Sequence, residues 1–261
     1  MRVHVVPCLA DNYAYLLDDE AGRAVVVDPS EAPPIEAALR ARGLALSGIW
    51  LTHHHWDHVG GIEALCAARD GQPPLEVLGS AYDLEHGRIA RQTRGLREGD
   101  GLSCAGHPVA LLEIPGHTLG AIAYVVDGRL FSGDTLFLAG CGRVFEGTMP
   151  MMQASLAKLR ALVSDTLVYC GHEYTAANLK FAATVEPDND AVRERAFVAA
   201  AMRARGEPTA PGALGHELAT NPFLRWDAPG VIAHARACGA TSDDPASVFG
   251  AIRHAKDAFK S

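Results

Sequence analysis

The chain has 261 residues, enough for one large domain or for one medium and one small domain. Its hydrophobic content of 48% and its mean hydropathy of +0.04 are ordinary for a protein with a packed core. The net charge of −8 counts against a nucleic-acid partner, because phosphate contacts favour basic surfaces. No apolar run approaches the roughly 20 residues of a membrane span, and the N-terminal residues are typical of a strand rather than a signal peptide. We therefore expect a cytoplasmic protein without membrane attachment.

The first two thirds of the chain alternate between strand patterns and helix patterns. Short apolar runs predict strands over 13–17, 23–28, 46–51, 75–78, 109–114, 121–126, 129–132 and 167–170. Asp127-Gly128 is a strong two-residue hairpin signal between two of these runs. Apolar spacing and Pro/Gly boundaries predict helices over 33–42, 59–69 and 152–163.

After residue 172 the strand patterns end. Helical patterns follow over 178–185, 191–205 and 247–259, with a Gly/Pro-rich connector over 206–215. We therefore expect residues 1–173 to form a domain of two sheets with helices outside, and residues 174–261 to form a helical domain.

The stretch Thr52-His53-His54-His55-Trp56-Asp57-His58 is the most informative part of the sequence. In an extended backbone His53 and His55 face the same way, and Asp57 and His58 follow as the chain turns into a helix. Such a density of nitrogen and oxygen ligands on one strand-to-helix loop is typical of transition-metal binding.

Further candidates lie on loops after expected strands. His117, Asp134 and His172 each follow a glycine, which permits a tight turn that aims the next side chain into a cleft. Asp28 follows a strand in Val-Asp-Pro, and we expect it to orient a ligand imidazole by a hydrogen bond. The other histidines lack these contexts and are expected to be surface or core residues.

Seven candidate ligands exceed the four that one zinc ion takes. We therefore expect two divalent metal ions about 3.5 Å apart. The expected partition gives each ion three side chains and a shared carboxylate: His53, His55 and His117 for one, Asp57, His58 and His172 for the other, and Asp134 as the bridge. The rival interpretation is one metal, with Asp57 acting as a base. Zinc is the expected occupant, and iron and manganese also accept His/Asp ligands.

These ligands resemble those of the glyoxalase II family, the hydroxyacylglutathione hydrolases, within the metallo-β-lactamase superfamily. The similarity extends over nearly the whole chain through Gly-Asp-Thr-Leu-Phe, Ala-Gly-Cys-Gly-Arg, Cys-Gly-His-Glu-Tyr, Asn221-Pro222-Phe223 and Lys256-Asp257-x-Phe259. The ligand motif alone specifies the superfamily, whereas its combination with the tail is much more specific. The resemblance implies an α+β fold, a four-layer αββα sandwich followed by a small C-terminal helical domain.

The resemblance also implies hydrolysis of S-D-lactoylglutathione, and of related 2-hydroxyacylglutathiones, to D-lactate and glutathione, the second step of methylglyoxal detoxification. A metal-bridging hydroxide would attack the thioester carbonyl, with Asp57 and Asp134 as the catalytic carboxylates. The sequence contains no Gly-x-Ser-x-Gly elbow that would suggest a protein nucleophile.

Carried across by position, the glutathione-binding residues would be Arg143, Phe145, Tyr174, Arg253 and Lys256. The family often has Lys at position 143 and Tyr at position 145, so one phenolic hydroxyl is missing here. From the residues alone, Arg253 and Lys256 share a helix face. That face fits either a substrate carboxylate or a solvated surface on which Asp257 pairs with Arg253, and the resemblance favours binding.

Two other functions stay open. One is an iron-dependent persulfide dioxygenase of the same fold, and the other is a non-catalytic metal-binding module. The complete ligand set and the long helical tail favour the hydrolase. We expect a small-molecule glutathione thioester as the partner, no nucleic-acid or membrane partner, and a monomer. The six cysteines form no Cys-x-x-Cys pair and are expected to be reduced.

Overall fold

The structure is a computed structural model that describes residues 1–68 and 73–259. The contacts between its residues divide the chain into two compact units. Unit 1 comprises Met1–Glu113 and Gly120–Gly133, and unit 2 comprises Ile114–Leu119 and Asp134–Ser261. The predicted domain division at residues 173 and 174 stays a prediction.

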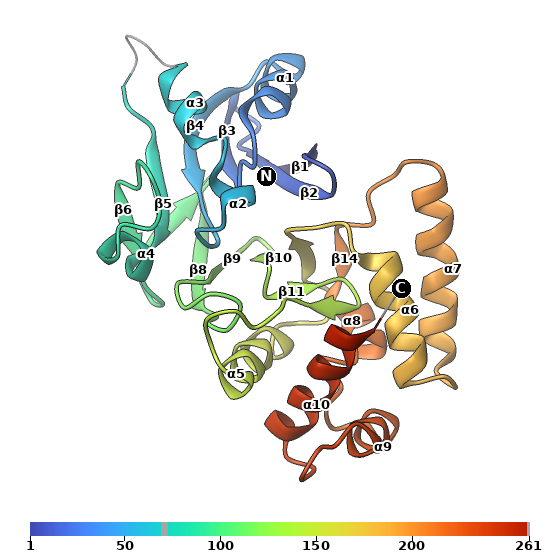
Figure 1. Cartoon of the computed structure of the whole chain (residues 1–261). Helices are drawn as coiled ribbons and strands as arrows, with labels where there is room; N and C mark the ends of the chain where they lie inside the picture. Colours follow the sequence, from blue (N-terminus) through green and yellow to red (C-terminus); the bar gives the residue numbers. More distant parts are fainter. Residues whose placement is uncertain (69–72, 260–261) are drawn as a thin grey trace. The chain divides into compact units, whose positions relative to one another are not determined.

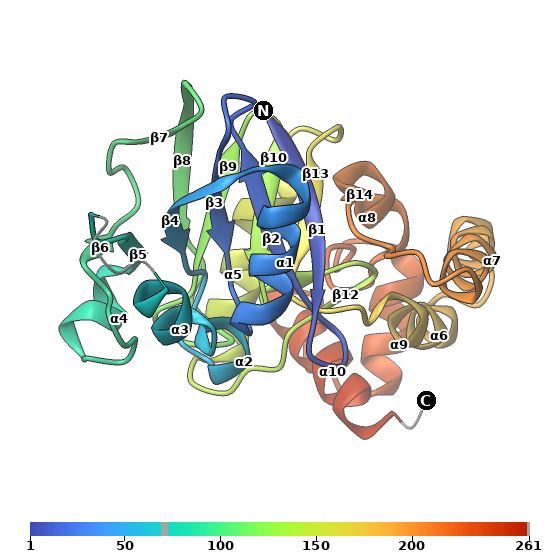
Figure 2. The ribbon, with the colours of Figure 1, turned by 90° about the horizontal axis from the view of Figure 1, so that it is seen from above.

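The first sheet of unit 1 has six strands that follow one another in chain order (Figures 1 and 2). They are β1 (Arg2–Cys8), β2 (Asn12–Asp18), β3 (Arg23–Val27), β4 (Ala45–Trp50), β5 (Glu76–Ser80) and β6 (Arg94–Leu96). The pairs from β1 to β3 are antiparallel and those from β3 to β6 are parallel. Such parallel strands need crossover connections, which place the loop after β4 at the carboxyl edge of the sheet.

Helices α1 (Ala32–Arg42) and α3 (Ile62–Ala67) cover one face of this sheet (Figure 2). Ile35 and Leu65 from these helices join the same buried cluster as Leu16 and Ile49 from the strands. Helix α1 begins with prolines in its first turn and ends at Gly43, which has a left-handed backbone with φ of 64°. These boundaries confirm the predicted helix over 33–42.

The predicted helix over 59–69 is wrong in its extent. The structure has a short helix α2 (Trp56–Val59) and then α3. The helix is interrupted because the Gly61 N–H donates to the Pro29 carbonyl at 2.8 Å, so it is diverted from the helical ladder. The predicted end at residue 69 lies outside the described residues.

The second sheet of unit 1 is antiparallel and contains β7 (Leu102–Cys104), β8 (His107–Glu113), β9 (Ile122–Val126) and β10 (Arg129–Gly133). Aromatic rings join it to the first sheet, since Trp50 stacks on Tyr124 with centroids 4.9 Å apart. The Tyr124 hydroxyl also donates to the Leu51 carbonyl at 3.0 Å. The predicted hairpin at Asp127-Gly128 is confirmed, with both residues at positive φ (49° and 72°). Helix α4 (Ala81–Glu85) connects β5 to β6 within the first sheet.

Unit 2 is mainly helical, with α6 and α7 side by side (Figures 1 and 2). Its helices are α5 (Met149–Arg160), α6 (Thr175–Val185), α7 (Asp190–Ala204), α8 (Leu214–Thr220), α9 (Pro229–Ala237) and α10 (Pro245–Ala258). Its strands are β11 (Leu136–Phe137), β12 (Gly140–Cys141), β13 (Leu167–Cys170) and β14 (Gly212–Ala213). The pairs β11–β12 and β13–β14 are antiparallel.

Three details of unit 2 correct the sequence analysis. The helix expected over 152–163 ends at Arg160, and Val163 lies beyond it with 73% of its surface exposed. The Gly/Pro-rich connector over 206–215 contains strand β14, so strand structure does not end at residue 172. Helices α8 and α9 were not predicted: both are short, with Gly215 inside α8 and Pro229-Gly230 at the start of α9.

A buried polar network from α8 holds the β11–β12 hairpin. The Ala139 N–H donates to Glu217 Oε2 at 2.7 Å, and Asn221 Nδ2 donates to the Gly140 carbonyl at 2.9 Å. Glu217 and Asn221 have no exposed surface, and Arg195 pairs with Glu217. This network satisfies backbone groups that would otherwise be costly to bury and fixes the hairpin that carries part of the site described below.

Among the helices in the described part of the chain, none combines the length and apolar character needed to cross a bilayer.

Candidate active site

The histidine loop of unit 1 runs from the end of β4 into α2. His53 Nε2 and His55 Nδ1 lie 3.1 Å apart, so the two side chains converge as the alternate spacing predicts. His58 is fully buried at the other end of the loop, and its Nε2 lies 3.8 Å from Asp57 Oδ2. The loop therefore gathers its predicted ligand atoms on one side of the backbone.

The Asp28 carboxylate holds this loop in place through hydrogen bonds. It accepts from the Thr52 N–H at 2.8 Å and from the Thr52 hydroxyl at 2.6 Å, and it lies 3.0 Å from His58 Nδ1. Asp28 is buried and has a left-handed φ of 49°, an unfavourable conformation for a residue other than glycine. The surrounding contacts maintain this backbone, which aims the carboxylate at the loop.

These hydrogen bonds fix the imidazole tautomers. The Thr52 hydroxyl gives its one proton to Asp28, so it accepts from His53 Nδ1, which lies 3.1 Å away. His58 likewise donates its Nδ1 proton to Asp28. Both rings therefore keep a lone pair on Nε2, which is the form that binds a metal. Asp28, His53 and His58 offer ligand atoms within 4.8 Å of one another.

Asn12 orients the remaining candidate in this loop. Its Nδ2 donates to both the carbonyl and Oδ2 of Asp57, each at 3.0 Å. The sequence analysis did not select Asn12, because it lies on β2, far from the motif in the chain.

The predicted ligands of unit 2 converge on one carboxylate oxygen. His117 Nε2 lies 3.6 Å from Asp134 Oδ2, and His172 Nε2 lies 3.3 Å from the same atom. His117 donates its Nδ1 proton to the Arg143 carbonyl at 2.8 Å, which again leaves the lone pair on Nε2. Gly133, at φ of 49°, makes the turn before Asp134, and its Cα packs so closely that a Cβ would lie 2.2 Å from the Thr52 hydroxyl.

The two ligand sets fit a metal ion by chemistry and by spacing. Imidazole nitrogen and carboxylate oxygen are the donors that zinc, iron and manganese accept. Two nitrogen ligands of a tetrahedral zinc ion, each 2.0–2.1 Å from the metal, lie roughly 3.3 Å apart. The spacings of 3.1 Å in unit 1, and of 3.3 and 3.6 Å in unit 2, match this value.

A cavity of about 480 Å³ in unit 2 adjoins these ligands. It is lined by all five residues that were expected to bind substrate and by two of the ligands: Arg143, Phe145, Tyr174, Arg253, Lys256, His117 and Asp134. Phe137, Cys141 and Asp257 also line it. The sequence analysis did not assign Phe137 and Cys141 to the site, although both lie within the Gly-Asp-Thr-Leu-Phe and Ala-Gly-Cys-Gly-Arg stretches that carry the resemblance.

The cations of this cavity differ in environment. Arg253 is only 3% exposed, and it donates to the Cys141 carbonyl and to Asp257 Oδ1, both at 2.9 Å. Arg143 is largely exposed, with its Nε 3.8 Å from the same Asp257 oxygen. Burial, and then the neighbouring Arg253 charge, lower the pKa of Lys256. Its Nζ lies 5.3 Å from the ring centres of Phe181 and Phe259.

Comparisons with known proteins match two consecutive parts of the chain. The metallo-β-lactamase superfamily model matches residues 10–172, and the model of the hydroxyacylglutathione hydrolase C-terminus matches residues 173–259. A hydroxyacylglutathione hydrolase of Alkalilimnicola ehrlichii is 52% identical over 260 residues, which cover 98% of each chain. The chain belongs to the hydroxyacylglutathione hydrolase family. The predicted family and hydrolase class are confirmed, and the dioxygenase alternative is not favoured.

Solved structures confirm the predicted α+β fold class for this hydroxyacylglutathione hydrolase family member. The BLEG-1 B3 metallo-β-lactamase matches with a TM-score of 0.65 at 22% identity, over 85% of this chain and 99% of that one. TTHA1623, solved in a di-iron-bound form, matches with a TM-score of 0.59 at 27% identity, over 84% and 98% of the two chains. The superfamily and the His/Asp clusters support the binding of a divalent metal.

Aromatic rings cover the ligands of this family member on the cavity side. Tyr174 stacks on His172 with centroids 4.8 Å apart and an interplanar angle of 3°. The Phe145 ring centre lies 5.2 Å from that of His117, and Phe145 is 61% exposed. The phenyl ring at position 145 therefore retains contact with a ligand imidazole and lacks the hydroxyl that the resemblance leads one to expect.

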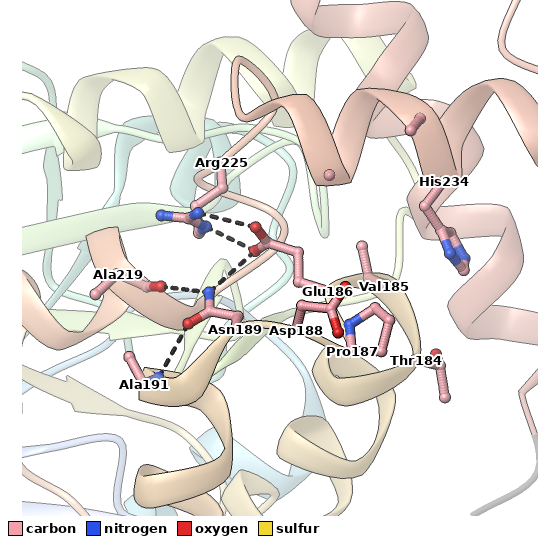
Figure 3. Close-up of a pocket in the computed structure, with 12 residues that line it drawn as sticks. Thr184, Val185, Glu186, Pro187, Asp188, Asn189, Ala191, Ala219, Arg225 and His234 are labelled. Atoms are coloured by element: carbon pink, nitrogen blue, oxygen red, sulfur yellow. Dashed lines mark hydrogen bonds and ion pairs between the residues drawn. The ribbon is translucent and has the colours of Figure 1, made fainter.

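A second cavity in the hydroxyacylglutathione hydrolase C-terminal region has a volume of about 740 Å³ and lies between the α6–α7 turn and α9 (Figure 3). Polar side chains that line this cavity form hydrogen bonds with other residues of its wall. Arg225 donates to both oxygens of Glu186, at 2.7 and 2.9 Å, and Asn189 donates to the Ala219 carbonyl at 3.0 Å. These contacts fix the turn, and none of the predicted ligands lines this cavity.

Proposed function

We propose that the chain hydrolyses S-D-lactoylglutathione and related 2-hydroxyacylglutathiones to a 2-hydroxy acid and glutathione, the second step of methylglyoxal detoxification. The observation that carries this proposal is the cavity of about 480 Å³ in unit 2, which places cationic side chains beside two candidate metal ligands. Glutathione has a carboxylate at each end, so a cavity with several cations is complementary to it. The family of the chain supports the same substrate class.

Seven side chains are proposed to hold two divalent metal ions, with zinc as the first candidate and iron or manganese as the others. They are His53, His55, Asp57, His58, His117, Asp134 and His172, with Asp134 as the bridge. The tautomers and atom spacings within each unit support this set. When bound, the metal ions supply a water of lowered pKa and a Lewis acid for the thioester carbonyl.

The residues of the chain orient both reactants. Asn12 fixes Asp57, so that the Asp57 carboxylate would be held in place to orient the attacking water. Asp28 acts through Thr52 and His58 and keeps the ligand rings in the metal-binding tautomer. Because these side chains are already held in place, less conformational entropy is lost when the transition state forms.

The cavity wall is proposed to bind the glutathione part of the substrate. Arg143, Arg253 and Lys256 receive carboxylates, and Tyr174 and Phe145 pack against the peptide. The thiolate leaves readily because a thiol pKa near 8.5 makes it a modest base.

A cysteine nucleophile is not needed. Burial raises the pKa of Cys141 to about 11 and that of Cys170 to about 12, so both thiols stay protonated.

We also propose that the protein acts in the cytoplasm as a monomer, without nucleic-acid or membrane partners. All six cysteines are free thiols, which fits a reducing compartment. The net charge of −8 disfavours binding to polyphosphates.

The test compares two thioesters in protein of known metal content. S-D-lactoylglutathione and the D-lactoyl thioester of N-acetylcysteamine share the reacting bond, but only the first carries the glutathione carboxylates. We expect metal-dependent hydrolysis of the glutathione ester, with kcat/KM at least about 100-fold above that of the short ester, because two charge-assisted contacts are at stake. Equal kcat/KM values would contradict the assignment of the cavity. Oxygen uptake with glutathione persulfide, without thioester hydrolysis, would establish the dioxygenase instead.

A further inference from the structure

His54 lies between two candidate ligands and takes no part in the proposed metal set. Its ring contacts a cluster formed by α4 and the residues after it. Arg88 Nη2 lies 2.8 Å from His54 Nε2, and His54 Nδ1 lies 3.7 Å from Asp83 Oδ1. Arg88 Nε lies 3.9 Å from the same Asp83 oxygen. Each of the three side chains therefore lies within 4 Å of the other two, next to the ligand loop.

The chemistry of these groups fixes the tautomer of His54. A guanidinium has only donors, so His54 Nε2 must accept from Arg88. The ring proton is then on Nδ1, which faces the Asp83 carboxylate. His54 is thus held as a neutral ring with one edge toward a cation and the other toward an anion.

Burial and hydrogen bonds hold Asp83 in a fixed position. It has no exposed surface, and its N–H donates to the Ser80 hydroxyl at 3.0 Å, which caps α4. The Arg88 N–H donates to the Asp83 carbonyl at 2.9 Å. Gly120 packs on the carboxylate so closely that a Cβ there would lie 2.3 Å from Asp83 Oδ1. A buried carboxylate is costly to keep unless it serves neighbouring groups.

We propose that Asp83 and Arg88 are positioning residues for the metal-ligand loop. They fix the ring of His54, and the backbone on either side of it presents His53 and His55 at the 3.1 Å spacing of their nitrogens. Asp28 holds the loop through Thr52 and His58, and Asp83 holds it through His54. This inference rests on the proposed function only in that the loop binds metal.

The first experiment measures metal release rather than turnover. Zinc-loaded wild type and Asp83→Asn are mixed with excess chelator, and the rate of zinc transfer is recorded under native conditions. We expect release to be about 10- to 100-fold faster in Asp83→Asn, the range seen when a residue behind metal ligands is lost. Asp127→Asn is the matched control, because Asp127 lies 3.6 Å from His107 in a comparable but exposed pair. This control should release zinc at the wild-type rate.

A purely structural role predicts a different result. Urea unfolding of the metal-free proteins measures the contribution of Asp83 to stability. If Asp83 only supports packing, the unfolding midpoint shifts while the zinc release rate stays within about twofold of wild type, and the inference is overturned. If the wild type itself binds no divalent metal, the proposed function fails too, so the two failures are distinguishable.

A double-mutant cycle tests the same contact from the other side. Gly120 does not have a positive φ, so Gly120→Ala is opposed mainly by the collision of its methyl group with the Asp83 carboxylate. We expect Gly120→Ala to accelerate zinc release. In an Asp83→Ala background the carboxylate is absent, and the added methyl should cause no further acceleration. Additive effects of the two substitutions would show that Gly120 acts through another neighbour and would remove this support.

Discussion

The two units orient their candidate ligands in different ways. In unit 1 the ligands lie on one short loop, and side chains orient them: Asp28 through Thr52 and His58, and Asn12 through Asp57. In unit 2 the ligands lie on three separate loops and are aimed largely by the backbone. The Arg143 carbonyl accepts from His117, and glycine precedes each ligand. Unit 1 is therefore vulnerable to single side-chain changes, whereas unit 2 depends on the fold around it.

The units also differ in what lies beside the ligands. His53, His58 and Asp28 in unit 1 are enclosed, with at most 2% exposure. His117 and Asp134 in unit 2 border a cavity whose cations range from buried Arg253 to exposed Arg143. Substitutions in unit 1 should therefore change metal binding first, whereas substitutions around the cavity should change KM first.

The largest effect is expected for Asp134→Ala in unit 2, because this carboxylate faces two imidazoles. The variant should bind less metal and lose at least about 1000-fold in kcat, since metal catalysis contributes several kcal/mol and each 1.36 kcal/mol is a factor of ten. Elemental analysis beside the thioester assay checks both quantities. Asp188→Ala, at an exposed position of unit 2, is the control. Retention of both metals with full turnover would reject the bridging assignment.

The side-chain control of unit 1 is tested by Asp28→Asn. The amide keeps the size of the carboxylate but replaces one acceptor oxygen by a donor. It therefore cannot accept from the Thr52 N–H, which contacts one oxygen of Asp28, and also from the Thr52 hydroxyl and His58, which contact the other. We expect metal affinity to fall about 10- to 100-fold, measured by competition with a chelator of known affinity.

Asp18→Asn is the matched control for this prediction. Asp18 is buried in unit 1 and lies 3.0 Å from His4 Nε2, in a His–carboxylate pair outside the ligand loop. This variant should change stability without changing metal affinity. An equal loss of metal affinity in both variants would show that the effect is not specific to Asp28 and follows from removing any buried carboxylate of unit 1.

The cavity of unit 2 should give an alkaline limit to binding through Lys256. Because burial lowers its pKa below the usual 10.5, Lys256 loses its proton at a lower pH than an exposed lysine as the pH rises. In the proposed assignment the charged form binds the substrate carboxylate, so KM should rise about two- to fivefold on the alkaline side of neutrality, the range of a partly exposed ion pair.

Lys256→Arg separates this titration from other alkaline effects. An arginine stays charged across the whole range, so the rise in KM should be absent from that variant. A KM profile that is unchanged by Lys256→Arg would show that another group titrates.

Local signals made much of the fold predictable. The prolines and Gly43 define α1, and Asp127-Gly128 defines the β9–β10 hairpin, because each boundary depends on the conformational preferences of adjacent residues. Helix α8 and strand β14 were missed because they are short and depend on tertiary contacts. The network of Glu217 with Ala139, which stabilises α8 against the hairpin, joins residues far apart in the chain.

The site divides in the same way. His53, His55 and His58 are recognisable because they lie together in the sequence, and the i,i+4 pairing of Arg253 with Asp257 was also open to prediction. Asn12 and Asp83 carry no motif, and only the packing of distant strands and helices brings them to the ligand loop. Sequence spacing therefore identifies the candidate ligands, whereas the side chains that contact and orient them become visible in the fold.

The smallest expected effect is that of Phe145→Tyr, which restores the hydroxyl that many relatives are expected to carry. The ring already lies 5.2 Å from that of His117 and is 61% exposed, so the new group gains a hydrogen bond that competes with water. KM should fall by about twofold, the lower end of what one net hydrogen bond contributes, with kcat unchanged. Phe145→Leu provides the opposite change, because it removes the ring that covers His117. A rise in KM for Phe145→Leu without a fall for Phe145→Tyr would show that this position contributes by packing alone, and that the missing hydroxyl has no counterpart on the substrate.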